Sequence, residues 1–447
     1  MDRRDRQRKR VTRGMARRVA PLAAVAMAAL TAAACSTGSS GAGSASAPAN
    51  AGAVTSATIK VLVNATPTLT QSFWNQQVHL FEQKYPKVKV TLENQGGQDL
   101  NTYFSTLMSS GNAPDVAEGL GGISTLVKDG VLAAFPKQSW ITSEASWQQQ
   151  TVNGGIYAPA AGLQPQSLVF YNKEDFAKAG IAAPPTSMAE LQADVTKLKS
   201  HGVTPFQGGS QFVTGAQLSS LVDPTLFEQD PSWFAQRNAG KVSFASSYWK
   251  TMLTTYQQWV HGQDFAPGAT STPYAQSETD FLKGDAAMYV MGSYVSPTID
   301  STPHSFTAGV FAVPTQDGQP ALAVSPTLSY EIMKKSPNYA DDVAFVKFME
   351  TDETAVANFL KTDGDYSASS PPVTYQQSAL STQIQQIVEG HTALTPCCTG
   401  SGSNSAPQEL SDEVTQQVQG LFTGSEGPDQ IVGTLDNWWT QQQGGAG

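Results

Sequence analysis

The chain is poor in cysteine, histidine and, beyond its first 18 residues, arginine. Its 447 residues hold three Cys and five His, and Arg237 is the one arginine after residue 18. The histidines are spread singly, with no HExxH or HxxxH pair, so a zinc site is not expected. Arginine is the usual bidentate partner of carboxylates and phosphates. Its scarcity speaks against amino acids, dicarboxylates and phosphate esters as ligands.

Sequence motifs for catalysis are also missing. There is no GxSxG elbow of a hydrolase and no GxxxxGK[ST] loop of an ATPase. The turn Asp363-Gly364-Asp365 lacks the remaining ligands of a calcium loop and is interpreted as an acidic turn. The numerous carboxylates leave a glycosidase pair open. We predict no catalytic residue, no metal and no cofactor.

The first 34 residues have the composition of an export signal. Residues 1–18 hold eight Arg and one Lys, and residues 19–34 form an uncharged, Ala-rich stretch followed by Cys35. This stretch of 16 residues is short for a transmembrane helix, which needs about 20. The chain is therefore expected to be exported, with residues 1–34 as its signal peptide.

The residues before Cys35 resemble a bacterial lipobox, with the sequence AAAC. The resemblance implies that Cys35 is lipidated and that the protein is anchored to the outer face of the cell membrane. A cleaved secretory signal with an incidental Cys is the alternative. Translation from Met15 instead of Met1, and twin-arginine export through Arg17 and Arg18, also stay open.

Residues 35–57 are mainly Ser, Gly, Ala and Thr without charge, and we expect a flexible linker.

Without residues 1–34 the chain retains 18 basic and 35 acidic residues, a net charge of −17. Such an acidic body repels nucleic acid and anionic membrane surfaces. We expect a monomer that contacts the membrane through its lipid anchor and binds no nucleic acid.

After the linker the chain reads as strand, helix, strand, helix, strand. Residues 59–63 (IKVLV) are mostly apolar and residues 88–92 (VKVTL) alternate, as in strands, and a third strand begins after Pro114. Residues 71–85 and 100–110 have helical periodicity. This order predicts parallel strands in a doubly wound α/β unit. Trp74, on the first helix, is interpreted as a core residue.

Residues 157–206 are the most informative segment. A strand over 167–171 passes into a helix over 174–179, which Gly180 ends. Ser187, three residues before Glu190, predicts the capping box of the next helix. The motif YNKEDFAKAGIAAPPTSMAEL within it resembles the pattern YN-K-x-x-F-x-x-A-G-I-x-x-P-P-x-T-x-x-E-L of extracellular solute-binding proteins of ABC importers, in the family that mostly carries sugars.

Four further segments follow the same family pattern in the expected order. They are GNAPDVAEG at 111–119, FLKGDAAMYVMGSY at 281–294, GVFAVPTQDG at 309–318 and the strand-to-helix segment at 328–359. The resemblance covers nearly all of residues 58–440. It implies a periplasmic-binding-protein-like α/β fold, with two doubly wound lobes joined by a three-segment hinge and a ligand cleft between them.

Carried onto this chain, the resemblance gives domain boundaries. Lobe one would comprise residues 58–162 and 322–367, and lobe two residues 163–313 and 371–443. The crossings between them would fall near residues 161–164, 313–323 and 366–371. Trp438 and Trp439 are expected to pack the C-terminal helix onto lobe two.

The function implied is capture of a sugar or oligosaccharide by lobe closure and its delivery to the transmembrane subunits of an ABC permease. An exported lipoprotein glycosidase, or another carbohydrate-active enzyme, is one alternative. A receptor of the same fold for a polyol, a nucleoside or a peptide is another. The chain's supply of 8 Trp, 13 Tyr and 19 Phe suits sugar faces, and its Asn and Gln suit hydroxyl groups.

Seven residues are predicted to bind the ligand. Asn64, Thr66 and Glu118 follow strands at their carboxyl ends, where open α/β sheets bind ligands. The resemblance adds four more: Tyr294 as a stacking aromatic, Gln164 beside the first crossing, and Gln211 with Phe212 in the ligand wall. The adjacent Cys397 and Cys398 would form a vicinal disulfide, stay reduced, or be a chance pair.

Overall fold

A computed structural model describes residues 54–145, 147–395, 404–407 and 409–444. The predicted signal peptide, Cys35 and the pair Cys397 and Cys398 lie outside the described residues. Within the described ranges, no helix combines the length and the apolar character that crossing a membrane requires.

The N-terminal part of the described chain forms the predicted strand–helix–strand–helix–strand unit. It consists of β1 (Thr58–Val63), α1 (Gln71–Lys84), β2 (Lys89–Asn94), α2 (Leu100–Ser109) and β3 (Val116–Glu118). Strand β1 pairs in parallel with both β2 and β3, which confirms the predicted parallel sheet.

Side-chain caps set where both helices of this unit begin. The Thr70 side chain accepts a hydrogen bond from the backbone N–H of Phe73, and Asp99 accepts one from Thr102. These bonds satisfy N–H groups that a helix leaves unpaired in its first turn. Helix α1 buries Trp74 and Phe81 against the sheet, as the sequence predicted for Trp74.

Strands from later in the chain complete a large sheet around this unit. They are β6 (Ala160–Pro165), β10 (Ala321–Ile332), β11 (Tyr366–Ser367) and β12 (Thr392–Leu394). The strand order is β11-β6-β10-β3-β1-β2, with β12 paired to β10. Each of the three predicted crossings thus lies in or beside one of the strands β6, β10 and β11. These strands are direct hydrogen-bonded neighbours.

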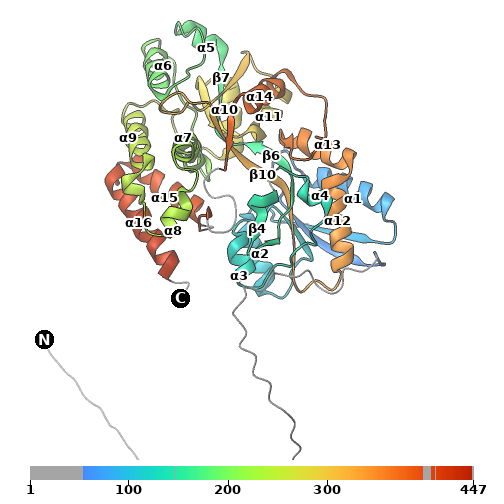
Figure 1. Ribbon diagram of the computed structural model, residues 1–447. Coiled ribbons are helices and arrows are strands. Elements are labelled where there is room, and N and C mark those ends of the chain that lie inside the picture. The colour runs from blue at the N-terminus through green and yellow to red at the C-terminus, as the bar shows by residue number, and fades with distance from the viewer. Residues whose placement is uncertain (1–53, 146, 396–403, 408, 445–447) are drawn as a thin grey trace, which may run out of the picture. The chain divides into compact units, whose positions relative to one another are not determined.

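A second, smaller sheet has three strands and packs against β10 and β11 of the large one. Strand β7 (Leu168–Asn172) pairs antiparallel with β8 (Met288–Met291) on one side and β9 (Ala308–Ala312) on the other. Strand β7 leads directly into α5 (Lys173–Lys178). In Figure 1, β6 and β10 lie near the centre of the view, between the blue and orange helices around the large sheet and the green helices near the smaller one. How the chain divides into lobes stays a prediction.

Helix α6 (Met188–Ser200) begins where the capping box predicted. The Ser187 hydroxyl accepts a hydrogen bond from the N–H of Glu190, and the Glu190 carboxylate accepts one from the N–H of Thr186. The return bond therefore reaches one residue further than in the standard box. Helix α10 (Tyr274–Lys283) ends at Gly284, whose φ of 87° is open to glycine at little energetic cost.

The remaining described elements connect and cover the two sheets. They are α3 (Ile123–Lys128), α4 (Ser139–Thr142), β4 (Thr151–Val152), β5 (Gly155–Ile156), α7 (Val213–Gln229), α8 (Trp233–Asn238), α9 (Tyr248–His261), α11 (Ser296–Ser301), α12 (Tyr339–Thr351), α13 (Glu353–Asp363), α14 (Ala379–Gly390), α15 (Leu410–Thr423) and α16 (Pro428–Gly444), with short 3-10 turns at Trp147–Gln150, Phe244–Ser246 and Ser293–Val295.

The C-terminal helix α16 packs through Trp439. This side chain is 1% exposed and its ring stacks on that of Phe234 of α8, with centroids 5.8 Å apart and planes 4° apart. Trp438 is partly buried against the same core. The tryptophan pair therefore packs α16 onto α8 and the core around it. That this core belongs to lobe two stays a prediction.

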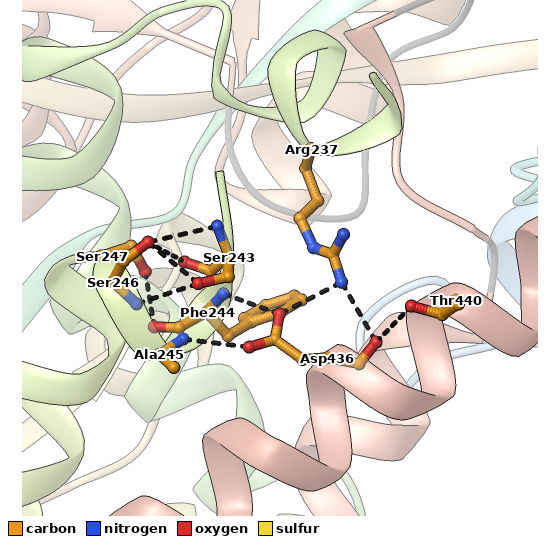
Figure 2. Close-up of polar contacts among 8 residues, drawn as sticks. All are labelled: Arg237, Ser243, Phe244, Ala245, Ser246, Ser247, Asp436 and Thr440. Atoms are coloured by element: carbon orange, nitrogen blue, oxygen red, sulfur yellow. Dashed lines mark hydrogen bonds and ion pairs between the residues drawn. The ribbon is translucent and has the colours of Figure 1, made fainter. Parts of the chain in front are cut away.

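Arg237, the one arginine after residue 18, fixes α16 to α8 (Figure 2). Its Nη2 lies 3.1 Å from Oδ1 of Asp436 and also donates to the Asp436 carbonyl oxygen at 3.1 Å. Its guanidinium carbon lies 5.8 Å from the ring centroid of Phe244 and 5.4 Å from that of Trp439. The same Asp436 carboxylate accepts from the N–H groups of Phe244 and Ala245, at 2.9 and 3.2 Å.

Replacement of Arg237 should destabilise the fold far more than replacement of an exposed basic residue. Arg237→Met leaves the Asp436 carboxylate, which is 21% exposed, without its cation. We expect the free energy of unfolding to fall by about 2–4 kcal/mol, as for other broken buried pairs. Lys250→Met removes an ion pair whose side chains are 46% and 81% exposed, and should change it by less than about 1 kcal/mol. Urea unfolding of both variants measures the difference, and equal losses would contradict this role.

Candidate functional site

A cavity of about 970 Å³ holds the candidate site. One part of its lining comes from the ends of β1 and β3, from β10 and from the end of α13. Another part comes from residues 211–212, from the start of α10 and from Tyr294. All seven residues predicted to bind ligand line this one cavity: Asn64, Thr66, Glu118, Gln164, Gln211, Phe212 and Tyr294. Their contact with a ligand stays a prediction.

The ends of the parallel strands β1 and β3 meet at the cavity. The N–H of Asn64, directly after β1, donates to Oε2 of Glu118 at 3.0 Å. Gln95, directly after β2, donates from Nε2 to Oδ1 of Asn64 at 2.9 Å and accepts from the N–H of Ala65 at 2.9 Å. The strands are parallel, so their carboxyl ends share an edge and bring these polar side chains together.

A second polar network connects the loop after β1 to the crossing strands. The Thr66 and Thr68 hydroxyls lie 3.1 Å apart, and Thr68 donates to Oδ1 of Asp363 at 3.2 Å. Gln164 Nε2 lies 3.0 Å from both Asp363 Oδ2 and Asp365 Oδ1. Its Oε1 accepts from Gln166 at 2.7 Å, so the Gln164 amide is engaged within the protein. Through these hydrogen bonds Gln164 holds Asp363 and Asp365 in place.

Three aromatic rings contribute the apolar part of the lining. The Phe212 and Tyr274 ring centroids are 5.0 Å apart, and those of Tyr274 and Tyr294 are 6.5 Å apart. Phe212 is 40% exposed, and among the described residues it and Val54 are the large hydrophobic side chains left this open. Gln211 holds the group in place, because it adopts a left-handed φ of 60° and its Oε1 accepts from the N–H of Tyr274 at 3.0 Å.

Burial raises the pKa values of the carboxyl groups that line the cavity. Burial, reinforced by the Asp363 charge, raises the pKa of Glu118 to about 8, although the Asn64 N–H favours the carboxylate. Burial raises the pKa of Asp363 to about 7. Burial also holds the pKa of Glu331 well above its usual range, and the N–H of Leu120 opposes the shift. Burial therefore makes these carboxyl groups hold their protons to higher pH than free Asp and Glu.

Sequence reasoning missed several lining residues. They are Thr68, Gln95, Gln98, Asp99, Asn101, Tyr274, Glu331, Asp363 and Asp412. The position of Gln95 directly after the second strand was a usable signal, the same one that identified Asn64 and Glu118. No sequence signal marked Tyr274, because its hydrogen bond with Gln211 joins residues 63 positions apart.

Chemically, the lining offers hydroxyl, amide and carboxyl groups opposite aromatic rings. No Lys, Arg or His is among the described residues that line the cavity. Elsewhere in the described ranges, no group of three or more His, Cys, Asp or Glu side chains is arranged to hold a metal ion. Such a lining matches a ligand with many hydroxyl groups and apolar faces.

Comparison with known proteins gives one family. A family model described as bacterial extracellular solute-binding protein matches residues 61–356. An uncharacterized ABC transporter extracellular-binding protein of Pyrococcus horikoshii is 25% identical over 261 residues, which is 52% of this chain and 56% of that protein. The match thus spans about half the length of that relative.

Solved structures share the fold. A chitin oligosaccharide binding protein superposes with a TM-score of 0.74 at 18% identity, covering 87% of this chain and 99% of that one. A sugar transporter protein from Bacillus licheniformis, solved in complex with stachyose, gives a TM-score of 0.69 at 15% identity, with 86% and 99% covered. At these identities the likeness concerns the fold.

The buried carboxyl groups of the site should make stability depend on pH. Free Asp and Glu titrate near pH 4, whereas Glu118 and Asp363 have pKa values of about 8 and about 7 in the folded chain. The folded state keeps protons that the unfolded state has lost, so the free energy of unfolding should fall as the pH rises from about 5 to about 8.

Urea unfolding across this pH range tests the prediction. Glu118→Gln should flatten the upper part of the slope, because the amide that replaces the carboxyl group does not titrate. Glu389→Gln, an exposed position on α14, should leave the slope unchanged. A stability that rises with pH over this range would overturn the prediction.

Proposed function

Because the chain belongs to the bacterial extracellular solute-binding protein family, we propose that it is the receptor of an ABC importer and that it binds a sugar or oligosaccharide. The family comprises binding components of transporters and not enzymes, and its members are extracellular, so the chain is an exported protein. The resemblance read from the sequence motifs is confirmed by the family match. The substrate class, and delivery to the transmembrane subunits of a permease, belong to the proposal.

One observation carries the sugar assignment: the cavity combines an amide and hydroxyl edge with open aromatic rings. Asn64, Gln95 and Thr66 lie at the ends of β1 and β2. Phe212 and Tyr294 belong to the ring group. A pyranose presents apolar C–H faces to rings and hydroxyl groups to amides, and its binding requires no balancing charge. The structural neighbours whose names mention chitin oligosaccharide and stachyose support the same class.

Ligand capture would proceed by closure of the two predicted lobes about the strands β6, β10 and β11. The network of Thr68, Asp363 and Gln164 lies beside these strands and at the cavity. A ligand that contacts both parts of the lining stabilises a closed state in which both are engaged. The boundaries 58–162 with 322–367 and 163–313 with 371–443 remain our proposal for the moving bodies.

A thermal-unfolding screen of residues 36–447 tests this function. Mono- and oligosaccharides should raise the melting temperature, because a ligand at 100 times its Kd adds about 2.7 kcal/mol to the folded state. Polyols, nucleosides, amino acids and short peptides are the comparison. A shift with one of these and none with any sugar would overturn the sugar class. Consumption of the sugar would instead support the glycosidase alternative.

Two ring variants locate the binding site in the same assay. Phe212→Ala and Tyr294→Ala should each weaken sugar binding by about 1–3 kcal/mol, the usual contribution of a desolvated aromatic contact. Phe212 is 40% exposed, so its loss should barely change the free energy of unfolding. Trp140→Ala, a partly buried aromatic on α4 outside the cavity, is the matched control. Unchanged affinity in both ring variants would place the site elsewhere.

We also propose that Cys35 carries the lipid that anchors the protein to the outer face of the membrane. The sequence AAAC after an apolar stretch and the uncharged linker of residues 35–57 support this. Cys35→Ser should move the expressed protein from the membrane fraction to the culture fluid or periplasm. Retention of the variant in the membrane fraction, at the wild-type level, would count against lipidation at Cys35.

A further inference from the structure

The ionisable side chains in the described part of the cavity lining are acidic or tyrosine, and none is basic. Five of its side chains are carboxyl groups and none is Lys, Arg or His: Asp99, Glu118, Glu331, Asp363 and Asp412. Glu118, Glu331 and Asp363 are 4%, 0% and 7% exposed, whereas Asp99 and Asp412 are exposed. Asp99 caps α2 and Asp412 lies in the first turn of α15. Partial burial, and then the charge of Asp99, raise the pKa of Asp412.

Glu331 is a second buried carboxyl group of the lining. Its Oε2 accepts from the N–H of Leu120 at 3.1 Å, and Leu120 also lines the cavity. Burial disfavours the ionised form of Glu331, and no described residue of the lining supplies a cation that would compensate for it.

The aromatic rings of the lining also favour a cation. Phe212, Tyr274 and Tyr294 line the cavity together with the carboxyl groups. The faces of aromatic rings attract cations, most strongly where water is excluded. Acidic side chains and ring faces in one cavity therefore both select for positive charge.

We propose that the preferred ligand is a carbohydrate that carries a protonated amino group, with Glu118 as the residue that sets this charge preference. The inference rests on the proposed function and narrows its substrate class. Sugars bearing carboxylates, such as uronic acids, would be rejected by the same lining.

The groups around Glu118 explain why a cation is preferred. Its titratable neighbours are Asp363 at the end of α13 and Tyr330 and Glu331 on β10, none of which supplies positive charge. The polar contact that favours its ionised form is the N–H of Asn64. In the free protein, burial therefore keeps Glu118 protonated at neutral pH. A bound ammonium group stabilises the carboxylate, so binding releases a proton to solvent.

The test compares sugars that differ by one amino group. The pairs are glucosamine with glucose, galactosamine with galactose, and chitosan oligosaccharides with chitin oligosaccharides of equal length. At a pH of about 6 we expect the amine to bind about tenfold more tightly or better, the gain of one hydrogen bond to a charged group. The preference should shrink with added salt.

The outcomes separate this inference from the proposed function. A neutral sugar that binds as tightly as its amine partner, or binding of neutral sugars alone, overturns the amine preference and leaves the sugar receptor intact. Absence of binding by every carbohydrate overturns the receptor itself, and the inference with it.

Calorimetry in two buffers of different ionisation enthalpy counts the proton. Binding of the amine sugar should release close to one proton from the native protein, and Glu118→Gln should abolish most of this release and reduce the affinity ratio between amine and neutral sugars. Glu389→Gln, at the exposed position on α14, should retain both. Thermal unfolding without ligand verifies that each variant is folded. Unchanged release and an unchanged ratio in Glu118→Gln would overturn the role of Glu118.

Discussion

The close pairing of β6 with β10 is the constraint on which the site depends. Gly162 of β6 lies opposite Thr327, where an added Cβ would lie 2.5 Å from the Thr327 Cγ2 and 3.1 Å from its carbonyl oxygen. Any larger residue would push the strands apart. At the next residue, Leu328, β10 adopts a left-handed φ of 53°. The pairing of β10 with β6 ends one residue later, at Ser329 opposite Ala160, and its pairing with β3 begins at Tyr330. The left-handed conformation of Leu328 is unfavourable for a non-glycine residue, so the surrounding pairings must maintain it.

The course of β10 from its pairing with β6 to its pairing with β3 positions both polar networks of the cavity. Beyond Leu328, β10 places Tyr330 opposite Glu118 and Glu331 opposite Ala117, which brings two acidic side chains to the edge where β1 and β3 end. Before it, the pairing of β10 with β6 fixes Gln164 beside Asp363 and Asp365. A change at the Gly162 contact would therefore alter the strand edge and the crossing together.

Local sequence patterns predicted the parallel unit, the Ser187 cap and the residues that follow the first and third strands, because these depend on neighbours in the chain. Asn64 and Glu118 were accessible to this reasoning, since strand ends of a parallel sheet share an edge. The ordered family motifs added Gln211, Phe212 and Tyr294. The hydrogen bond from Thr68 to Asp363 joins residues 295 positions apart. The left-handed Leu328 has none of the Gly or Asn signals that mark such a conformation. Contacts of this kind depend on tertiary packing alone.

The single arginine and the acidic groups of the cavity lie in different parts of the fold and have different roles. After residue 18 the chain has one arginine, Arg237 of α8, which pairs with Asp436 of α16 and stabilises their packing. The described lining of the cavity retains acidic groups without a compensating cation. Burial raises the pKa values of these carboxyl groups. The free protein therefore holds protons on them where an ionised group would need a cation beside it. A site in this state can donate hydrogen bonds to a neutral hydroxyl or exchange its proton for an ammonium group. Because no described residue of the lining is a cation, the proton exchange is the alternative that would pair a buried carboxylate with positive charge.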